Sequence, residues 1–567
     1  DVICRAVEVE NTGTDVLHLN RVMSMSMDFL TGEYELVHFY GRHFHEMNPE
    51  RTPVGHGCFA IGSRRGVSGH QHNPFAMLAE SGAGEEHGAV YGMALMYSGN
   101  FILEAQQDQY SQTRVQMGVS DERFDFLLDC GEHFFTPEVI MAFSDSGFRR
   151  LSHIFHRFIR NNVCREPYKL SRRPILVNNW EATYFDFTGE KLVEIAAEAA
   201  KLGIEMFVLD DGWFGERGPD DRGLGDWYVN TGKLGGELKD TVDKINALGL
   251  KFGLWIEPEM VNENSALYRA HPDWAMTIPG KPPVLGRSQL VLDFTRADVR
   301  TAIYDMICAV IDSANVEYIK MDMNRSICEA HSALAERQNF GELCYKYVLG
   351  VYDFIERLRT RYPDMLIEGC SSGGARFDAG MMYYTPQIWT SDNTDAIERL
   401  RIQYGASFGY PISVVGSHVS AVPNHQNGRI TDIDTRAAVA MSGNFGYELD
   451  LTKLSDEDKS KIRCQIEAFK ADWELIHNGL YYRVTDWPDK SGYMAWNSVS
   501  PDGAHALLTA VTTDSSGTDY GNPVVIYVRC KGLDAHARYV CRETGMTLSG
   551  SELMFIGIPL PAAGEYN

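Results

Sequence analysis

The chain lacks paired cysteines, long apolar runs and an excess of positive charge. Its 11 Cys are scattered without CxxC pairs, which excludes a disulfide framework and a zinc site and favours a reducing compartment. No apolar run approaches the ~20 residues that span a bilayer. The formal net charge of −25 argues against nucleic-acid and anionic-membrane partners, so we expect a neutral small-molecule substrate. The start shows neither a signal peptide nor an initiator Met, so we expect a processed or partial chain.

The 567 residues are too many for one hydrophobic core. Residues 1–165 contain short alternating runs separated by turns, which indicates a β-sandwich with a helical linker over residues 147–160. His70 and His72 in this part suggest a metal site, but no third ligand is apparent. We therefore expect them to belong to a polar loop that packs on a neighbouring domain.

From about residue 170 onwards, apolar strands alternate with amphipathic helices. The count, the length and the alternation predict a (β/α)8 barrel. A doubly wound open sheet is the alternative, but no GxGxxG motif follows the first strand. The eight predicted strands are residues 174–180, 206–210, 252–256, 290–293, 316–320, 365–370, 386–390 and 411–415.

One strand runs into three polar residues at alternate positions, Lys320, Asp322 and Asn324. Alternate side chains of a strand point the same way, so these three converge at its end. A carboxylate beside an ammonium and an amide is held in its charged form, as a nucleophilic Asp would need to be. A surface salt bridge at a strand end explains the same pattern.

Acids and tryptophans stand at the ends of most of the other strands, where the active site of such a barrel lies. Aromatic faces stack on sugar rings, carboxylates accept from hydroxyls, and no metal or phosphate motif is among these residues. The pattern predicts glycoside hydrolysis by two carboxylates without a cofactor or metal. A non-catalytic sugar-binding barrel is the alternative from a different class. The strand-end residues are Trp180, Asp210, Asp211, Trp255, Glu257, Arg287, Cys370 and Asp392.

Several motifs follow one another along the whole chain. In the barrel they are residues 209–214 (LDDGWF), 320–325 (KMDMNR), 370–378 (CSSGGARFD), 389–395 (WTSDNTD) and 418–426 (HVSAVPNHQ). In the β domain they are residues 64–68 (RRGVS) and 70–75 (HQHNPF). In these motifs the chain resembles the bacterial α-galactosidases of glycoside hydrolase family 36.

The resemblance implies three domains: an incomplete N-terminal β-supersandwich (residues 1–165), a catalytic barrel (166–480) and a small C-terminal β domain (481–567). It also implies a retaining hydrolase of terminal α-galactosyl groups, as in melibiose and raffinose, working as a homotetramer in the bacterial cytoplasm. The nucleophile would be Asp322 and the acid/base Asp392. The implied galactose-binding residues are Trp180, Asp210, Asp211, Trp255, Arg287, Lys320, Asn324, Cys370 and Gly373.

The chain departs from the family pattern at Met321, Ser372 and Asn393, where Trp, Gly and Asp are common. We expect Met321 to point away from the site, because its neighbours Lys320 and Asp322 face the site. From the resemblance we expect a further N-terminal segment of the family before residue 1. Asp395 is the fallback acid/base, although we expect it to cap a helix. An α-N-acetylgalactosaminidase and a galactosyl transferase of the raffinose- or stachyose-synthase kind remain alternative functions.

Overall fold

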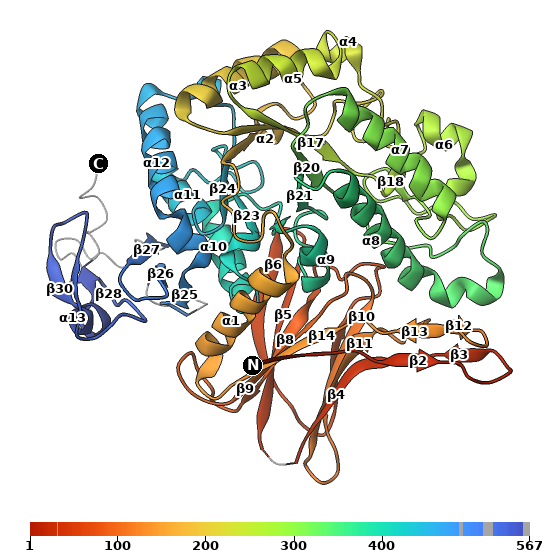
Figure 1. Cartoon of the computed structure of the whole chain (residues 1–567), viewed down its shortest axis with the longest axis horizontal. Helices are drawn as coiled ribbons and strands as arrows, with labels where there is room; N and C mark the ends of the chain where they lie inside the picture. The colour runs from red at the N-terminus through yellow and green to blue at the C-terminus, as the bar shows by residue number, and fades with distance from the viewer. Residues whose placement is uncertain (31, 487–491, 514–525, 560–567) are drawn as a thin grey trace.

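The computed structural model describes residues 1–30, 32–486, 492–513 and 526–559. Figure 1 shows a β domain in red and orange, a barrel from yellow through green and cyan to light blue, and a small β domain in darker blue. The predicted architecture of sandwich, (β/α)8 barrel and C-terminal β domain is confirmed. Residues 487–491, 514–525 and 560–567 of the predicted C-terminal domain lie outside the described residues. Among the described residues, no helix combines the length and apolar character that crossing a bilayer requires.

The N-terminal domain is built around a six-stranded antiparallel sheet with one core on each face. Alternate residues of a strand point to opposite faces. Thus Leu36 and Leu78 pack in a core shared with the second sheet, while Val37 and Met77 belong to the core that continues into the barrel. The sheet order is β1 (Val2–Arg5), β14 (Val139–Ser144), β9 (Val90–Leu95), β8 (His72–Glu80), β5 (Tyr34–Arg42) and β6 (His45–Pro53).

Smaller sheets cover the face of the six-stranded sheet that lies away from the barrel. The three-stranded sheet is β10 (Phe101–Gln107), β11 (Thr113–Val119) and β4 (Met23–Phe29), and β7 (Gly57–Gly62) lies beside β10. Two ribbons extend from it, β2 (Glu8–Glu10) with β13 (His133–Phe135) and β3 (Leu17–Leu19) with β12 (Phe126–Leu128). The linker then runs as α1 (Gly147–Phe158) and the π-helical turn η1 (Ile159–Val163).

The barrel closes with eight parallel strands. They are β15 (Leu176–Asn178), β16 (Met206–Leu209), β17 (Lys251–Ile256), β20 (Tyr318–Met321), β21 (Leu366–Gly369), β22 (Gln387–Trp389), β23 (Val415–Ser420) and β24 (Asn444–Glu448). The main outer helices are α3 (Gly189–Leu202), α5 (Leu238–Ala247), α7 (Ala297–Ser313), α8 (Leu343–Arg361), α9 (Ala379–Tyr384), α10 (Ala396–Ala406), α11 (Ile433–Ala440) and α12 (Asp456–Asn478).

Local sequence signals explain where these helices start and stop. In α3 the hydroxyl of Thr188 accepts from the N–H of Lys191, and Gly203 ends the helix at φ 90°. Five of its apolar residues follow the helical period and are buried: Leu192, Ile195, Ala196, Ala199 and Leu202. Short elements complete the barrel loops: α2 (Trp180–Thr183), α4 (Thr231–Leu234), α6 (Ala266–Ala270), η2 (Pro272–Trp274), η3 (Arg337–Glu342), η4 (Ile412–Val414) and η5 (Leu451–Lys453).

Two of the predicted barrel strands are wrong. The pattern predicts a barrel strand at residues 290–293, but β19 (Gln289–Val291) pairs antiparallel with β18 (Met260–Asn262), and β17 pairs directly with β20. The predicted strand 411–415 is mostly the 3-10 turn η4, and β23 starts only at its last residue. The eighth barrel strand is β24, which the sequence pattern does not predict. Its terminal Asn and Glu interrupt the apolar run, because their side chains bind polar groups inside the fold, as Glu448 binds His418.

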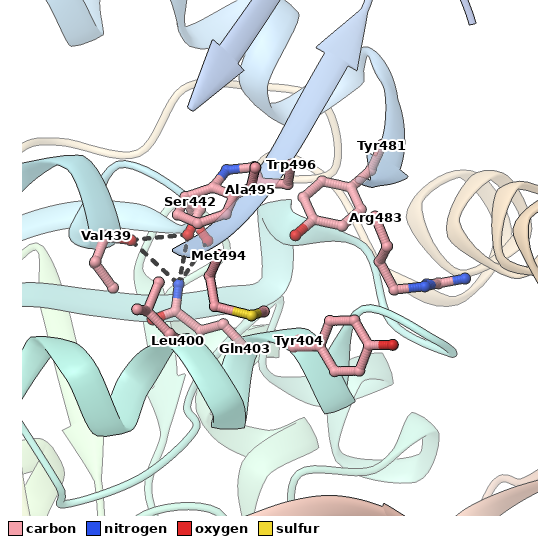
Figure 2. Close-up of a pocket in the computed structure, with 10 residues that line it drawn as sticks. All are labelled: Leu400, Gln403, Tyr404, Val439, Ser442, Tyr481, Arg483, Met494, Ala495 and Trp496. Atoms are coloured by element: carbon pink, nitrogen blue, oxygen red, sulfur yellow. Dashed lines mark hydrogen bonds between the residues drawn. The ribbon is translucent and has the colours of Figure 1, made fainter. Parts of the chain in front are cut away.

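The C-terminal domain packs on α10 and α11 through β25 (Leu480–Arg483) and β26 (Tyr493–Val499). Figure 2 shows a cavity at this junction, where the amide of Gln403 donates to Val439 O at 3.2 Å and Ser442 Oγ at 2.7 Å. Its volume of about 10 Å³ has room for about one water molecule. The other elements are β27 (Ala506–Thr512), β28 (Tyr527–Val528), β29 (Arg538–Val540), β30 (Thr547–Ser549), α13 (Gly550–Phe555) and β31 (Ile558–Pro559).

Candidate active site

Most of the predicted site residues converge at the C-terminal ends of the barrel strands. Lys320 is the next-to-last residue of β20, Asp322 and Asn324 follow at alternate positions, and all three are buried. Met321 packs in the hydrophobic core, as predicted from its position between them. The strand period therefore sets which side chains reach the mouth of the barrel.

Asp322 accepts four hydrogen bonds. Its Oδ2 accepts from Asn324 Nδ2 at 2.7 Å and from Trp255 Nε1 at 3.3 Å. Its Oδ1 accepts from the backbone N–H groups of Met323 at 2.8 Å and Ser372 at 3.3 Å. Donors on both oxygens hold the carboxylate in one orientation and stabilise its negative charge.

The ammonium of Lys320 pairs with Asp210 rather than with Asp322, which corrects the predicted partner. Nζ lies 2.9 Å from Asp210 Oδ2, and Asn178 Nδ2 donates to the same oxygen at 2.6 Å. Burial opposes the charged amine, but the surrounding acidic groups, Asp210 foremost, together outweigh this and raise the pKa of Lys320 well above its ordinary value. The pair keeps one cation and one anion side by side at the mouth.

Asp211 is held by Arg217, an arginine that no sequence motif indicates. The guanidinium of Arg217 donates from Nε at 3.0 Å and from Nη2 at 2.8 Å to the two oxygens of Asp211. Burial raises the pKa of Asp211, and the positive charge of Arg217 offsets only part of this effect. The loop after the LDDGWF motif therefore supplies the charge that a buried second acid requires.

Asp392 follows β22 and is bound from two domains. Trp389 Nε1 donates to its Oδ1 at 3.1 Å, and Nε2 of His43 in the N-terminal domain donates to its Oδ2 at 2.8 Å. Burial favours the neutral acid, but the bond and charge of His43 outweigh it, so the pKa of Asp392 lies below its ordinary value. Nothing near position 392 in the sequence indicates His43, which is 349 positions away.

Asp395 and Asn393, which follow Asp392 in the chain, bind other groups. Asp395 caps α10 by accepting from the N–H of Glu398 at 2.9 Å, as predicted, and pairs with Arg429 at 2.7 Å. The amide of Asn393 donates to Phe44 O at 3.0 Å, so this departure from the family pattern binds the N-terminal domain.

The predicted polar loop around His70 packs on the barrel. His70 Nε2 donates to Ser372 O at 2.7 Å, and Gly69 N donates to Ala375 O at 2.7 Å. The expectation of a domain contact at this loop is confirmed. No cluster of His, Cys, Asp and Glu in the described ranges has the geometry of a metal site.

Glu257 is among the predicted strand-end residues but not among the implied catalytic or galactose-binding residues. It follows β17 and is completely buried, with Oε1 accepting from Asn324 N at 2.5 Å and Oε2 from Gln289 Nε2 at 3.0 Å. Burial, reinforced by the charge of Asp322, raises the pKa of Glu257 to about 8. The acid is therefore mostly neutral at pH 7 and adds little negative charge beside Asp322. Its place at a strand end was the available signal.

The turn after β21 brings backbone against the site. Ser372 and Gly373 have φ of 46° and 73°, and a Cβ on Gly373 would lie 2.6 Å from Asp392 N. Ser372 thus adopts a left-handed conformation despite its side chain, whose Oγ donates to Asn324 Oδ1 at 3.1 Å. Cys370 is buried, and burial foremost raises the pKa of its thiol well above the ordinary value.

Trp180 and Arg287 lie farther out. Trp180 begins α2 and is half-buried, while Arg287 is exposed and pairs with Asp220 at 3.3 Å. The structure brings the other predicted residues together at one mouth and leaves these two at its rim.

The family comparisons cover nearly the whole chain. Residues 1–129 match the glycosyl hydrolase family 36 N-terminal domain, residues 133–479 match melibiase, and residues 493–567 match the family 36 C-terminal domain. Together the three matches follow the order of the domains in Figure 1.

Similar proteins agree with these matches. The chain is 52% identical over its full length to the bifunctional α-galactosidase/sucrose kinase AgaSK of Mediterraneibacter gnavus, of which it spans 59%. It is 47% identical to α-galactosidase AgaA of Geobacillus stearothermophilus, covering 99% of this chain and 76% of that protein. The solved AgaA structure has a TM-score of 0.96 over 99% of this chain and 77% of that chain, and a variant of AgaA was solved in complex with raffinose. The chain belongs to glycosyl hydrolase family 36, the family of these bacterial α-galactosidases, as its motifs predicted.

Proposed function

We propose that this protein hydrolyses terminal α-galactosyl groups of oligosaccharides such as melibiose and raffinose, with retention of configuration. The observation that carries the proposal is the contrast between two carboxyl groups at one barrel mouth. Asp322 accepts only from N–H donors that hold it as a carboxylate, whereas Asp392 is bonded to a titratable imidazole. One group suits a nucleophile and the other suits proton transfer.

The proposed reaction has two displacements. Asp322 attacks the anomeric carbon, while protonated Asp392 gives its proton to the leaving oxygen, which departs with the bonding electron pair. Asp392, now a carboxylate, takes a proton from water as the water oxygen displaces Asp322 from the sugar. The neutral acid of Glu257 supports this scheme, because a second carboxylate beside Asp322 would oppose the negative charge that Asp322 needs as a nucleophile.

Galactose would be bound by the polar groups beside these acids. The Asp210–Lys320 pair offers an acceptor and a donor to the 4- and 6-hydroxyls, and Asp211 has free lone pairs beyond its bonds to Arg217. Cys370 and the backbone of Gly373 would contact the 2-hydroxyl. Trp255 would form a wall, and Trp180 and Arg287 would meet the sugar from the rim.

An α-N-acetylgalactosaminidase is the second candidate function. It needs space for an acetamido group at C2, where the turn after β21 lies under this proposal. Gly373 packs against the backbone of Asp392 so closely that a Cβ does not fit. This packing favours galactose. Hydrolysis and galactosyl transfer are distinguished by the products from raffinose, free galactose or a longer oligosaccharide.

The nucleophile is tested with Asp322→Gly and an activated aryl α-galactoside. We expect loss of turnover, partial rescue by azide, and β-galactosyl azide as the product in NMR, because azide attacks from the vacated face. An α-azide product would contradict the retaining mechanism. Asp395→Asn is the matched control, since Asp395 caps α10; azide should not change its rate.

A further inference from the structure

A hairpin turn of the N-terminal domain reaches into the barrel mouth. The turn between β5 and β6 carries His43, whose Nε2 donates to Asp392 Oδ2 at 2.8 Å. The imidazole stacks on Phe44 with 3.8 Å between ring centroids, which fixes the ring plane. The side chain of His43 is 39% exposed, so it borders the open side of the site.

The turn is tied to the residues on both sides of Asp392. The buried carboxyl of Glu46 accepts from Ser391 Oγ at 2.6 Å and from Phe44 N at 3.2 Å. On the other side, Asn393 Nδ2 donates to Phe44 O at 3.0 Å. Phe44 has φ 67°, a left-handed conformation that these bonds maintain at a cost in backbone strain. The position of His43 relative to Asp392 is therefore set by at least three contacts other than their own hydrogen bond.

We propose that His43 is a positioning residue for the acid/base carboxyl, with which it shares the proton that protonates the leaving group. This inference rests on the proposed role of Asp392. In the resting pair, the proton lies on His43 Nε2 and is hydrogen-bonded to Asp392 Oδ2. It passes to the carboxyl, and from there to the glycosidic oxygen as the bond to the anomeric carbon breaks. In the second displacement Asp392 accepts a proton from water, and this proton restores the pair.

The surroundings make such sharing possible. Burial works against a charged His43, but the bond to Asp392 and the negative charges of Asp392 and Glu46 together outweigh it and raise the pKa of His43 above its ordinary value. The pKa of Asp392 moves the opposite way. Other groups that act on the pair electrostatically come from both domains, so the pair titrates within a larger network: Glu46 and His70 from the β domain, with Arg287, Lys320, Cys370, Arg399 and His425 from the barrel.

A shared proton changes the pH dependence of the reaction. Two coupled groups bind their common proton more tightly than Asp392 could alone, because either site can hold it. The alkaline limb of kcat/KM for a substrate with a poor leaving group then reports the pair. Without His43, the alkaline limb reports the titration of Asp392 alone, so kcat/KM begins to decrease at a lower pH. A purely structural role would lower the rate without moving this limb.

The test compares pH profiles of wild type and His43→Gln for melibiose and for p-nitrophenyl α-galactoside. We expect the alkaline limb for melibiose to move at least about one pH unit lower in the variant. The aryl substrate should respond less, because p-nitrophenolate departs without a proton. His45→Gln is the matched control, since His45 lies on β6 and has no hydrogen bond to Asp392. A limb at the same pH in wild type and His43→Gln would overturn the proposal.

Two further measurements keep the outcome clear. If His43→Gln does not fold, histidine-selective NMR of wild type and Asp392→Asn replaces it. The pH midpoint of one imidazole titration should be lower in Asp392→Asn than in wild type. Identical titration midpoints in the two proteins would overturn the proposal. Asp392→Ala distinguishes failure of the acid role of Asp392 from failure of proton sharing with His43. Equal losses with melibiose and the aryl galactoside would refute Asp392 as the acid, whereas unequal losses with an unmoved limb in His43→Gln refute only the sharing.

Discussion

The indole of Trp255 donates its Nε1 proton to Oδ2 of Asp322 at 3.3 Å. The backbone carbonyl of Trp255 in turn accepts from Nε1 of Trp213 at 2.9 Å, and both rings are buried. A residue predicted only as an aromatic wall therefore also holds the proposed nucleophile. The wall and the hydrogen bond can be tested separately, because Phe still offers an aromatic ring but lacks the N–H donor.

Trp255→Phe should lower kcat/KM for an aryl α-galactoside by about ten- to a hundredfold. A hydrogen bond to a charged group contributes about 1.5–3 kcal/mol, and ~1.4 kcal/mol corresponds to tenfold. Steady-state kinetics measures the loss, and thermal unfolding checks that the fold is kept. An unchanged kcat/KM would show that this donor does not support the reaction.

Asp392→Ala should slow melibiose hydrolysis by about 10²–10⁴-fold, the range of general acid catalysis. Aryl galactosides with good leaving groups should lose much less, because they need no proton to depart. Rates for a series of aryl galactosides with leaving groups of increasing pKa give the measurement. The rate should depend on that pKa more steeply in Asp392→Ala than in wild type; parallel dependences would exclude Asp392 as the acid.

Arg217→Met should destabilise the barrel, because it leaves the buried carboxylate of Asp211 without its partner. Breaking a buried pair costs about 3–5 kcal/mol. The midpoint of thermal unfolding should fall, and Asp211→Asn in the same chain should recover part of the loss. Arg222→Met is the control: Arg222 pairs with Asp221 at the surface, so its removal should leave the midpoint of thermal unfolding nearly unchanged.

Glu257 should make stability depend on pH. The native carboxyl has a pKa of about 8, against ~4.3 for an unfolded Glu, so the native state binds more protons between these values. Stability from this group is complete below the unfolded pKa and is lost as the pH rises toward 8. In Glu257→Gln that loss disappears. Unfolding midpoints from pH 5 to 8 should decline less steeply in the variant, and parallel curves would contradict the prediction.

Cys370 should contribute to selectivity at the second carbon of the sugar. We expect a preference for galactosides over N-acetylgalactosaminides of at least about a hundredfold, or roughly 2.7 kcal/mol. Specificity constants for the two p-nitrophenyl glycosides measure it. Cys370→Ala should narrow the gap by opening space beside Gly373. Equal constants in wild type would favour the N-acetylgalactosaminidase function.

The sequence by itself determined the fold class and the center of the site. Apolar strands alternating with helices specify a barrel, and the barrel determines which strand ends carry chemistry. The two-residue period of a strand then assigns Lys320, Asp322 and Asn324 to the site and Met321 to the core. These properties depend on the pattern of neighbouring residues, so the sequence alone predicts them.

Tertiary structure alone decided which groups meet. The local pattern predicts a barrel strand at residues 290–293 and none at 444–448, but the closed barrel contains the second segment and not the first. His43 meets Asp392, and Arg217 meets Asp211, through loops and a domain contact that leave no periodic signal in the chain. The neutral form of Glu257 likewise depends on burial beside Asp322. Hydrogen bonds and desolvation act through space, so partners and protonation states follow from the assembled fold rather than from local pattern.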